Sequence, residues 1–351
     1  MTGNPGCAGL RPHVARLPYY KNNEEILAAM KHFIACLASV SLMTVSSGYA
    51  LASDDLHRGL PSNVAPDKAA LHDLKAVNGA LLAVGEIGLV MRSDDGGRTW
   101  SSRYASTDRT LTAIQAVSDQ RLLAVGHGGT MVRSEDGGRL WQKVEVADAG
   151  LDSFLGITRL ASGRLLAYGA YGMYFTSDDD GATWSRSHVF DDAFEWHITG
   201  IAEQDDRLYL VGEAGTLGVS TDAGKTWSKL ESPYSGSLFG VLALKDGAVL
   251  VYGMRGHAFR STDQGQSWSA ISLGVQSAIN NGSVAESGNV LLTGDNGLLA
   301  ASSDNGQTFT LIPAPTSTPI GSALYAHDGA LVYVGYMAAG RLATTAENNL
   351  K

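Results

Sequence analysis

The chain has 351 residues, with 26 Lys and Arg against 35 Asp and Glu, so its formal net charge is -9 at pH 7. This excess of acid disfavours nucleic acids and anionic lipid surfaces as partners. The chain has two cysteines, Cys7 and Cys36, which are too few for a scaffold held together by several disulfides.

The first predicted element is an export signal. Residues 30–53 read MKHFIACLASVSLMTVSSGYALAS, with a short basic start, an apolar middle and an Ala-x-Ala end at Ala50 and Ala52. These are the parts of a secretory signal peptide, and the apolar middle is too short for a membrane span of about 20 residues. We therefore expect residues 1–52 to be a leader followed by a signal peptide, Met30–Ala52, that is cleaved after Ala52.

Cleavage there would remove both cysteines and leave 22 basic against 33 acidic residues, a net charge of -11. A chain without thiols tolerates an oxidising compartment. The sequence thus predicts a periplasmic or secreted protein with no direct membrane span. Residues 53–351 contain no linker or low-complexity segment, which predicts a single domain.

Six copies of one short motif follow, here called the box, with the ideal form Ser-x-Asp-x-Gly-x-Thr-Trp. They begin 41, 43, 43, 41 and 41 residues apart, a period typical of four-stranded propeller blades. In each box we expect Ser and Asp to bond nearby backbone N–H groups and the aromatic ring to be buried against the sheet. The predicted structural residues are Ser93, Asp95 and Trp100; Ser134, Asp136 and Trp141; Ser177, Asp179 and Trp184; Ser220, Asp222 and Trp227; Ser261, Asp263 and Trp268; and Ser302, Asp304 and Phe309.

The box at Ser177 reads SDDDGATW and hints at a calcium loop. Such a loop needs alternating oxygen ligands and a downstream bidentate Glu, and neither follows Gly181. The sequence therefore predicts no metal site and no cofactor.

A second motif, Gly-x-x-Gly, lies eight residues before each box. It begins at Gly85, Gly126, Gly169, Gly212, Gly253 and Gly294, and recurs as GYMA at Gly335 with no box behind it. We expect it to be the turn between the second and third strands of a blade, with Gly supplying a positive φ. Seven repeats predict an all-β fold, a seven-bladed β-propeller of four-stranded antiparallel blades. Because the seventh unit lacks an outer strand, we expect residues 54–70 to supply that strand and close the ring.

This connectivity separates two faces of the predicted propeller. The boxes lie on one face, whereas the Gly-x-x-Gly turns and the interblade loops lie on the other, around the mouth of the central channel. We expect ligands to bind the second face, where the turns also carry Tyr171 and Arg255. The competing interpretation is that its polar residues are merely solvated. The candidate partner-binding residues in its turns are Glu86, His127, Glu213, Asp295 and Tyr336.

One interblade loop is unusually aromatic. Residues 187–200 contain Phe190, Phe194, Trp196 and His197, and Trp196 is the only tryptophan outside the boxes. Aromatic side chains on a loop are typical of a protein contact. The alternative is that these rings only cover the edge of a blade.

An enzyme on this scaffold is the alternative from another class. A sialidase would need paired carboxylates and an arginine cluster that holds the substrate. Arg92, Arg133 and Arg260 instead share one strand position before the box serines, which indicates surface or interblade residues. The histidines show no spacing for a metal or a nucleophile–base pair. No catalytic residue is predicted.

Together, these features resemble the bacterial-neuraminidase-repeat propellers, and more closely the photosystem II stability/assembly factor family and its proteobacterial relatives. Gly85–Trp100 follows the family pattern GxxGxxxxSxDGGxTW, and the resemblance spans residues 54–345. It implies a non-enzymatic, extracytoplasmic scaffold or assembly factor that binds a protein of a membrane complex.

Photosynthetic members of that family dock through an arginine-rich patch, which cannot be located on this acidic chain. The resemblance therefore implies an envelope or export complex as client, such as a resistance-nodulation-division type exporter. We also expect the protein to be a monomer. A secreted glycoside hydrolase or glycan-binding propeller remains the alternative function.

Overall fold

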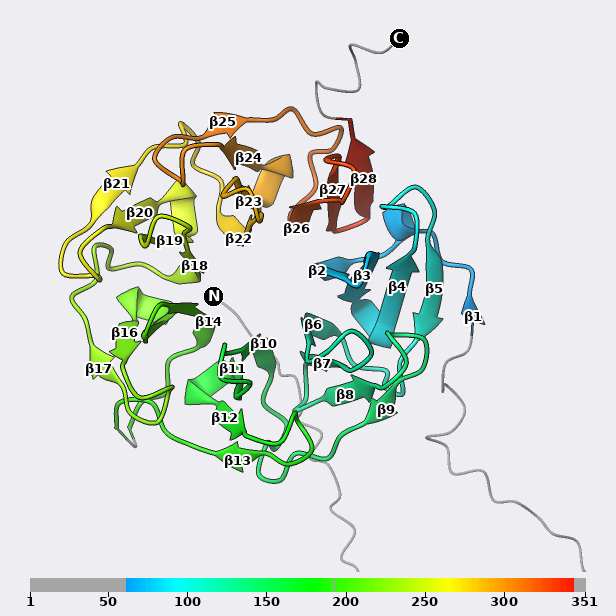
Figure 1. Ribbon diagram of the computed structural model, residues 1–351, viewed down its shortest axis with the longest axis horizontal. Coiled ribbons are helices and arrows are strands. Elements are labelled where there is room, and N and C mark those ends of the chain that lie inside the picture. The colour runs from blue at the N-terminus through cyan, green and yellow to red at the C-terminus, as the bar shows by residue number, and fades with distance from the viewer. Residues whose placement is uncertain (1–60, 192, 344–351) are drawn as a thin grey trace, which may run out of the picture. The chain divides into compact units, whose positions relative to one another are not determined.

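The computed structural model describes residues 61–191 and 193–343. In this part of the chain the strands form seven antiparallel sheets, arranged as blades around a central channel (Figure 1). The fold is a seven-bladed β-propeller, as the repeats predicted. None of the helices in these ranges is long and apolar enough to cross a bilayer. The predicted signal peptide, Met30–Ala52, lies outside the described residues.

Each complete blade is a meander of four strands that runs from the channel outwards. Blade 1 contains β2 (Leu71–Val77), β3 (Ala80–Gly85), β4 (Leu89–Ser93) and β5 (Ser101–Tyr104); blade 2 contains β6 (Leu111–Ala116), β7 (Leu122–Gly126), β8 (Met131–Ser134) and β9 (Gln142–Lys143); blade 3 contains β10 (Phe154–Arg159), β11 (Leu165–Gly169), β12 (Tyr174–Ser177) and β13 (Ser185–Arg186). Blade 4 contains β14 (Ile198–Gln204), β15 (Arg207–Gly212), β16 (Leu217–Ser220) and β17 (Ser228–Lys229); blade 5 contains β18 (Leu238–Ala243), β19 (Val249–Gly253), β20 (Ala258–Ser261) and β21 (Ser269–Ile271); blade 6 contains β22 (Ile279–Val284), β23 (Val290–Gly294), β24 (Leu299–Ser302) and β25 (Thr310–Leu311); blade 7 contains β26 (Ile320–Tyr325), β27 (Leu331–Gly335) and β28 (Ala338–Leu342).

The hydrophobic core lies between neighbouring blades. The second strands, such as LLAVG in β7 and VLVYG in β19, are buried along their whole length because another sheet covers each of their faces. For example, Leu82 of blade 1 packs in one cluster with Leu122 of blade 2 and with Trp141 of its box. A strand covered on both faces reads as a continuous apolar run instead of an alternating one.

Each box forms the turn between the third and fourth strands. In the first box Ser93 Oγ donates to Asp95 Oδ1 and accepts from Gly97 N, both at 2.8 Å. Asp95 then accepts from the backbone N and the hydroxyl of Thr99, at 2.9 and 2.6 Å. The Ser–Asp–Gly part of this network recurs in the other five boxes. The aspartates are thus committed to backbone and hydroxyl donors of their own turn.

The aromatic ring of each box packs into the interblade core. Trp141, Trp184 and Trp227 are buried, and the rings of the other three boxes are half-buried. Trp141 and Trp184 donate from Nε1 to the carbonyl of a box glycine, at 3.1 and 3.2 Å. At Trp227 the corresponding carbonyl, that of Gly224, accepts instead from the Tyr174 hydroxyl at 2.8 Å.

The ring does not close as the sequence predicted. Blade 7 has three strands in the described residues, and the first strand, β1 (Pro61–Ser62), pairs with β5 as a fifth strand of blade 1. The outer strand β5 is four residues long, whereas β9, β13, β17 and β25 have two, so it offers a longer edge for pairing. Residues 54–60 of the predicted closing segment lie outside the described part.

Other contacts join blade 7 to blade 1. Ala70 forms an isolated bridge with Tyr336, and Met337 N donates to Ala69 O at 3.0 Å. On the opposite face, Arg341 Nε donates to the carbonyl of Gly96 at 3.2 Å, and Asp328 pairs with Arg341 and with Arg98 of blade 1. Side chains and short backbone contacts therefore hold the seam between the last blade and the first.

The hydrogen bond from Arg341 to a box carbonyl of the next blade has equivalents between other blades. Arg92 of blade 1 donates to the carbonyl of Gly137 in the box of blade 2, and Arg260 of blade 5 donates to the carbonyl of Asn305 in the box of blade 6. This matches the interblade interpretation of Arg92 and Arg260. For Arg133, the third residue of that prediction, the ion pair is with Glu135 of its own blade, at 3.1 Å.

Candidate functional site

The Gly-x-x-Gly turns lie at the end of each blade opposite the boxes, because strand directions alternate. We call this end the turn face. In each turn the first glycine closely approaches the carbonyl that precedes the inner strand: a Cβ on Gly85 would lie 2.0 Å from Ala70 O. Glu86 N donates to the same carbonyl at 3.0 Å. Glycine is required at the first position because any Cβ there would clash with this carbonyl. The φ of the first glycine is extended, and the predicted positive φ belongs instead to the following residues, as at Gly88.

The second residue of several turns folds back onto the start of the inner strand. Glu86 Oε1 accepts from Ala70 N at 2.9 Å, and Asp295 Oδ1 accepts from the Asn280 side chain at 2.9 Å. His127 Nδ1 lies 2.9 Å from Ser153 Oγ. Three of the predicted contact residues, Glu86, His127 and Asp295, thus have partners within the fold. The residue types gave no signal of this, because the partners come from the preceding strand or the next blade.

Glu213 and His197, both predicted as contacts, also bond each other. Glu213 Oε2 accepts from His197 N at 3.1 Å and lies 2.8 Å from His197 Nδ1. The ring of Tyr171 meets the imidazole edge-on, with centroids 4.9 Å apart. These three side chains connect the turns of blades 3 and 4 into one polar and aromatic group.

The third residue of the turn is held in the left-handed region and is exposed wherever it carries a side chain. Its φ is near 50° in five turns that carry a side chain there and in the incomplete seventh turn, whereas blade 2 has Gly128 at this position. Ile87, Tyr171 and Met337 are more than half exposed. The full set with side chains is Ile87, Tyr171, Ala214, Arg255, Asn296 and Met337. The sequence analysis did not predict Ile87 or Met337 as candidate contact residues. A usable signal was present, because the turn GHGG has a glycine at the position where these two turns carry a large side chain.

The aromatic loop between blades 3 and 4 divides into a packed part and an exposed part. Phe190, at φ 65, and Phe194 meet edge-on with centroids 5.2 Å apart and pack against the core between blades 3 and 4. The Phe190 ring occupies the space above Gly218 of β16. These two rings cover the blade edge, as the alternative interpretation proposed.

Trp196 is instead 53% exposed. Its carbonyl accepts from Gly172 N at 3.0 Å, which ties the loop to the turn of blade 3. A cavity of about 280 Å³ lies between Trp196, Phe194, Leu230 and Lys229. Trp196 is therefore the aromatic residue of this loop that a partner can reach.

A central cavity of about 750 Å³ opens within the ring of inner strands. Every inner strand carries a bulge after its first residue, and the extra residue lines this cavity. Bulges commonly re-aim one side chain out of the regular alternation of a strand. The seven bulge residues are His72, Thr112, Leu155, Thr199, Phe239, Asn280 and Gly321.

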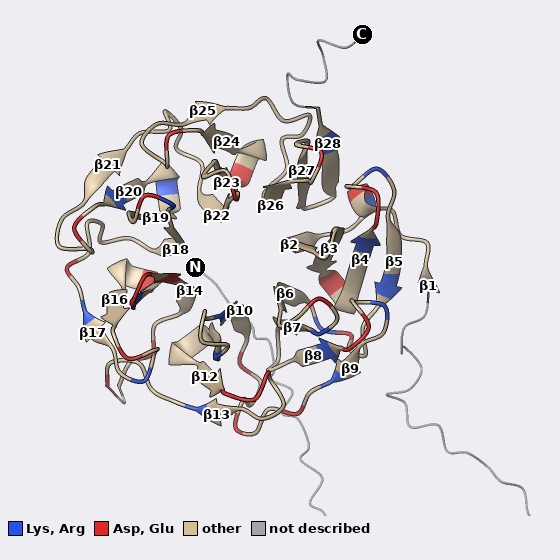
Figure 2. Cartoon of the chain, viewed as in Figure 1, with Lys and Arg blue, Asp and Glu red and all other residues tan. Residues whose placement is uncertain are grey.

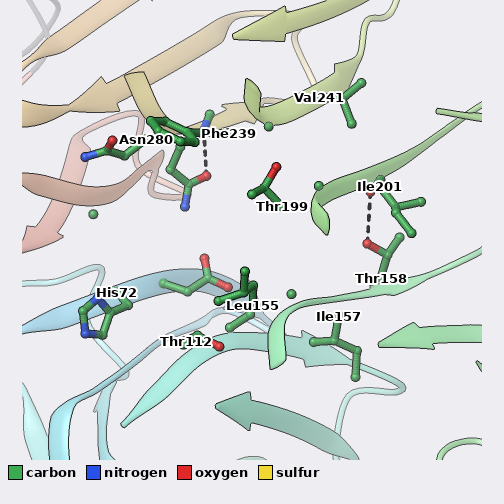
Figure 3. A pocket seen from close by; sticks show the side chains of 18 of the residues that line it. His72, Thr112, Leu155, Ile157, Thr158, Thr199, Ile201, Phe239, Val241 and Asn280 are labelled. Atoms are coloured by element: carbon green, nitrogen blue, oxygen red, sulfur yellow. Dashed lines mark hydrogen bonds between the residues drawn. The ribbon is translucent and has the colours of Figure 1, made fainter. Parts of the chain in front are cut away.

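The wall of this cavity has two unlike halves (Figure 3). Ile157, Ile201 and Val241 come from blades 3, 4 and 5, and lie on one side; His72 and Asn280 lie on the other. Desolvation inside the channel and the nearby His127 lower the pKa of His72, which favours the neutral imidazole. The cavity thus suits a partner segment with both an apolar and a hydrogen-bonding side.

Tyr336, the last predicted contact residue, lines the mouth of this cavity and is 56% exposed. It belongs to a wider pattern. Seven of the nine large apolar side chains that are exposed in the described residues lie in turns or interblade loops of the turn face; Leu140 of a box and Leu311 of an outer strand are the other two. A concentration of exposed apolar side chains on one face is typical of a protein-binding surface.

No group of three or more His, Cys, Asp or Glu residues in the described ranges could hold a metal ion. In the acidic box of blade 3, Asp179 accepts from the N and the hydroxyl of Thr183, at 2.9 and 2.6 Å. The box carboxylates therefore serve their own turns.

Comparison with known proteins agrees with this architecture. Residues 158–291 match the family model described as photosynthesis system II assembly factor YCF48, and this confirms the predicted resemblance. No curated protein matches. Among solved structures, the chain is similar to one described as YCF48 bound to D1 peptide, at 18% identity and a TM-score of 0.64, covering 80% of this chain and 93% of that chain.

The chain is also similar to YCF48 from Cyanidioschyzon merolae, at 14% identity and a TM-score of 0.62, covering 79% of this chain and 95% of that one. Virginiamycin B lyase from Staphylococcus aureus is similar as well, at 12% identity and a TM-score of 0.65, covering 79% and 95%. At these identities the structural likeness shows the shared propeller fold and does not transfer an activity.

Proposed function

On the premise that residues 158–291 match the photosynthesis system II assembly factor family, we propose that this chain is a non-enzymatic scaffold or assembly factor that binds a protein client through its turn face. The observation that carries the proposal is the concentration of exposed apolar side chains on that face, around the mouth of the central cavity. A similar propeller is described as bound to D1 peptide, so polypeptide recognition is compatible with the fold.

Trp196, Tyr171 and Tyr336 are the proposed anchors of this contact. Each is more than half exposed, and each belongs to a turn or loop that backbone hydrogen bonds hold in place. Aromatic side chains of this kind contribute much of the affinity in protein interfaces. Glu86, Glu213 and Asp295 are proposed to act indirectly, by fixing the inner-strand ends beside these anchors.

We further propose that the protein works outside the cytoplasm as a monomer, after cleavage at Ala52, on a client in an envelope complex such as a resistance-nodulation-division type exporter. The support for export is the signal-peptide pattern of Met30–Ala52. Mass spectrometry of the exported protein should find an N-terminus at Ser53. Recovery from the cytoplasm with residues 1–52 intact would contradict this part of the proposal.

Site-specific photo-crosslinking in cells tests the binding face. A photoreactive phenylalanine analogue at Tyr336 should give a crosslinked polypeptide, whereas the same analogue at Leu140 should give none. The two positions are matched in exposure, at 56% and 57%, but lie on opposite faces. Equal products at both positions, or no polypeptide product at Tyr336, would refute the proposed face. Reproducible glycoside hydrolysis by the purified protein would favour the enzyme alternative.

A further inference from the structure

The third position of the turns carries side chains that the fold itself does not favour. Ile87, Tyr171 and Met337 have φ values of 50°, 52° and 49°, a left-handed conformation that disfavours L-residues and especially a β-branched one such as Ile. Gly128 occupies the same position of blade 2 at φ 65, so glycine is compatible with this turn. Folding alone would therefore select glycine here.

Burial of these side chains does little to offset the strain of the backbone. Ile87 is 53% exposed and Met337 is 52% exposed. Residues in a sparsely populated backbone region persist where the surrounding structure imposes that conformation, and they are concentrated at binding and active sites. Exposed residues with a positive φ also occur at the opposite end of the blades, such as Asp180 and Gln264 of the boxes, but those side chains are polar, whereas Ile87 and Met337 are apolar.

We infer that Ile87, Tyr171, Arg255 and Met337 are contact residues for the client, and that the docking segment of the client is a basic polypeptide with apolar side chains. This inference rests on the proposed function and specifies its partner. Ile87 and Met337 lie on neighbouring blades beside Tyr336, and would receive apolar side chains. Tyr171, which lies beside Trp196 on another side of the channel, would also receive an apolar side chain.

Charge complementarity supports a basic segment. Acidic residues outnumber basic ones in the turns and loops of the turn face, and Figure 2 colours the charged residues of both faces along the chain. The acids in its turns and loops are Asp67, Glu86, Asp108, Glu145, Asp148, Asp152, Asp191, Glu195, Glu213, Glu231 and Asp295, and the bases are Lys68, Arg109 and Arg255. Lys68 and Arg109 are each paired with an adjacent aspartate. Other basic residues, such as Arg98, Arg121 and Arg139, lie at the opposite end of the blades, where the box turns and the first hairpins are.

Such a surface attracts a positively charged segment and repels an acidic one. Arg255 is the exception among the strained residues, because its charge opposes the rest of the face. It would pair with a single acidic group of the client and set the orientation of the segment.

The first test uses synthetic peptides of equal length in four sets: basic with apolar residues, acidic with apolar residues, basic without apolar residues and acidic without apolar residues. Fluorescence anisotropy with the purified protein should show that the basic, apolar set binds at least about ten-fold tighter than each of the others. Its affinity should fall as salt rises, because the attraction is partly electrostatic. Equal binding of all sets, or binding of none, would overturn the inference.

The second test replaces the strained residues by glycine. Ile87→Gly and Met337→Gly should each raise the Tm by about 2 °C, because strain is relieved, and should each weaken the basic, apolar peptides about five-fold or more. Ala214→Gly is the matched control. It removes one methyl group at φ 51, so it should raise the Tm without weakening the peptides.

The results distinguish this inference from the proposed function. If the glycine variants bind as tightly as the wild type while Tyr336 still crosslinks to a client, the strained positions are not contacts and the scaffold function stands. If Tyr336 gives no crosslinked polypeptide, the scaffold function itself fails. More stable glycine variants that bind less tightly would support the inference, because a merely structural role would lower both properties together.

Discussion

Arg341 of the last blade donates from Nε to the backbone carbonyl of Gly96 in the box of the first blade, over 3.2 Å. The same guanidinium pairs with Asp328 at 2.6 Å. Blade 7 has three strands in the described residues, so this side chain contributes directly to the closure of the ring.

Arg341→Met should therefore destabilise the ring at this seam. It removes charge-assisted hydrogen bonds from a side chain that is mostly buried, and we expect a loss of about 1–2 kcal/mol, because Asp328 is partly exposed. Thermal unfolding should show a Tm lower by about 2–4 °C. Arg139→Met is the control, because Arg139 donates to Asp136 O within its own box. An equal loss in both variants would argue against a special role for the seam.

Trp227 and Trp196 should behave in opposite ways. Trp227 is buried, so Trp227→Ala leaves a cavity and is expected to cost about 3–5 kcal/mol of folding free energy. Trp196→Ala should leave the Tm nearly unchanged, because the ring is half exposed, but should weaken client binding by about 2 kcal/mol or more. Calorimetry and a binding titration on the same variants separate the effects. Loss of stability with intact binding in Trp196→Ala would assign that ring to the core.

The lowered pKa values of the box aspartates predict that the folded state loses stability in acid. The hydroxyl and backbone N of Thr183 lower the pKa of Asp179 to about 2, and the equivalent donors of Ser267 lower the pKa of Asp263 to about 2. A carboxyl whose folded pKa is depressed stabilises the fold above its unfolded pKa of about 3.9, and the contribution is lost as pH falls towards the folded value.

The Tm should accordingly fall between about pH 4 and pH 2, and these groups should contribute no pH dependence above about pH 5. Asp263→Asn removes one such carboxylate and should shallow the decline in acid. Thermal melts across this range provide the measurement. A Tm that rises as pH falls below about 4 would show that the aspartates are not held by these donors.

Replacement of the first glycine of a turn, even by alanine, should destabilise the fold. In Gly294→Ala the new Cβ would lie 1.9 Å from Ala278 O, so the turn must shift and lose the hydrogen bond from Asp295 N. We expect a loss of about 3 kcal/mol or more. Gly274→Ala is the control, because Gly274 has a φ of 69° but a Cβ there would have no atom within 4 Å, and it should cost only about 1 kcal/mol. Chemical denaturation measures both, and equal losses would contradict the close approach.

The local parts of this fold could be predicted from the sequence because each depends on residues a few positions apart. The box network joins Ser93 to Gly97 and Asp95 to Thr99, so residue types at fixed spacing determine it. The burial of the second strands likewise follows from their continuous apolar runs. Seven such units fix the number of blades.

Features that depend on contacts between distant segments could not be predicted in this way. The site of β1 depends on which outer strand offers a free edge, and the partner of Glu86 is a backbone amide at Ala70, before the inner strand. The composition of the aromatic loop did not reveal that its rings have different roles. The packing of Phe190, for example, depends on the absence of a side chain at Gly218, which is distant in the sequence. Exposure of Ile87 and Met337 depends on φ values that the residue types do not reveal.

The brevity of the outer strands has a consequence for behaviour at high concentration. An exposed strand edge is a template on which a second molecule can add a strand and start aggregation. In blades 2, 3, 4 and 6 that edge is two residues long, and β9, β13 and β17 each end in Lys or Arg. At these four blades the rim thus offers little to a second copy of the chain. Self-association by edge pairing is therefore disfavoured along this part of the rim.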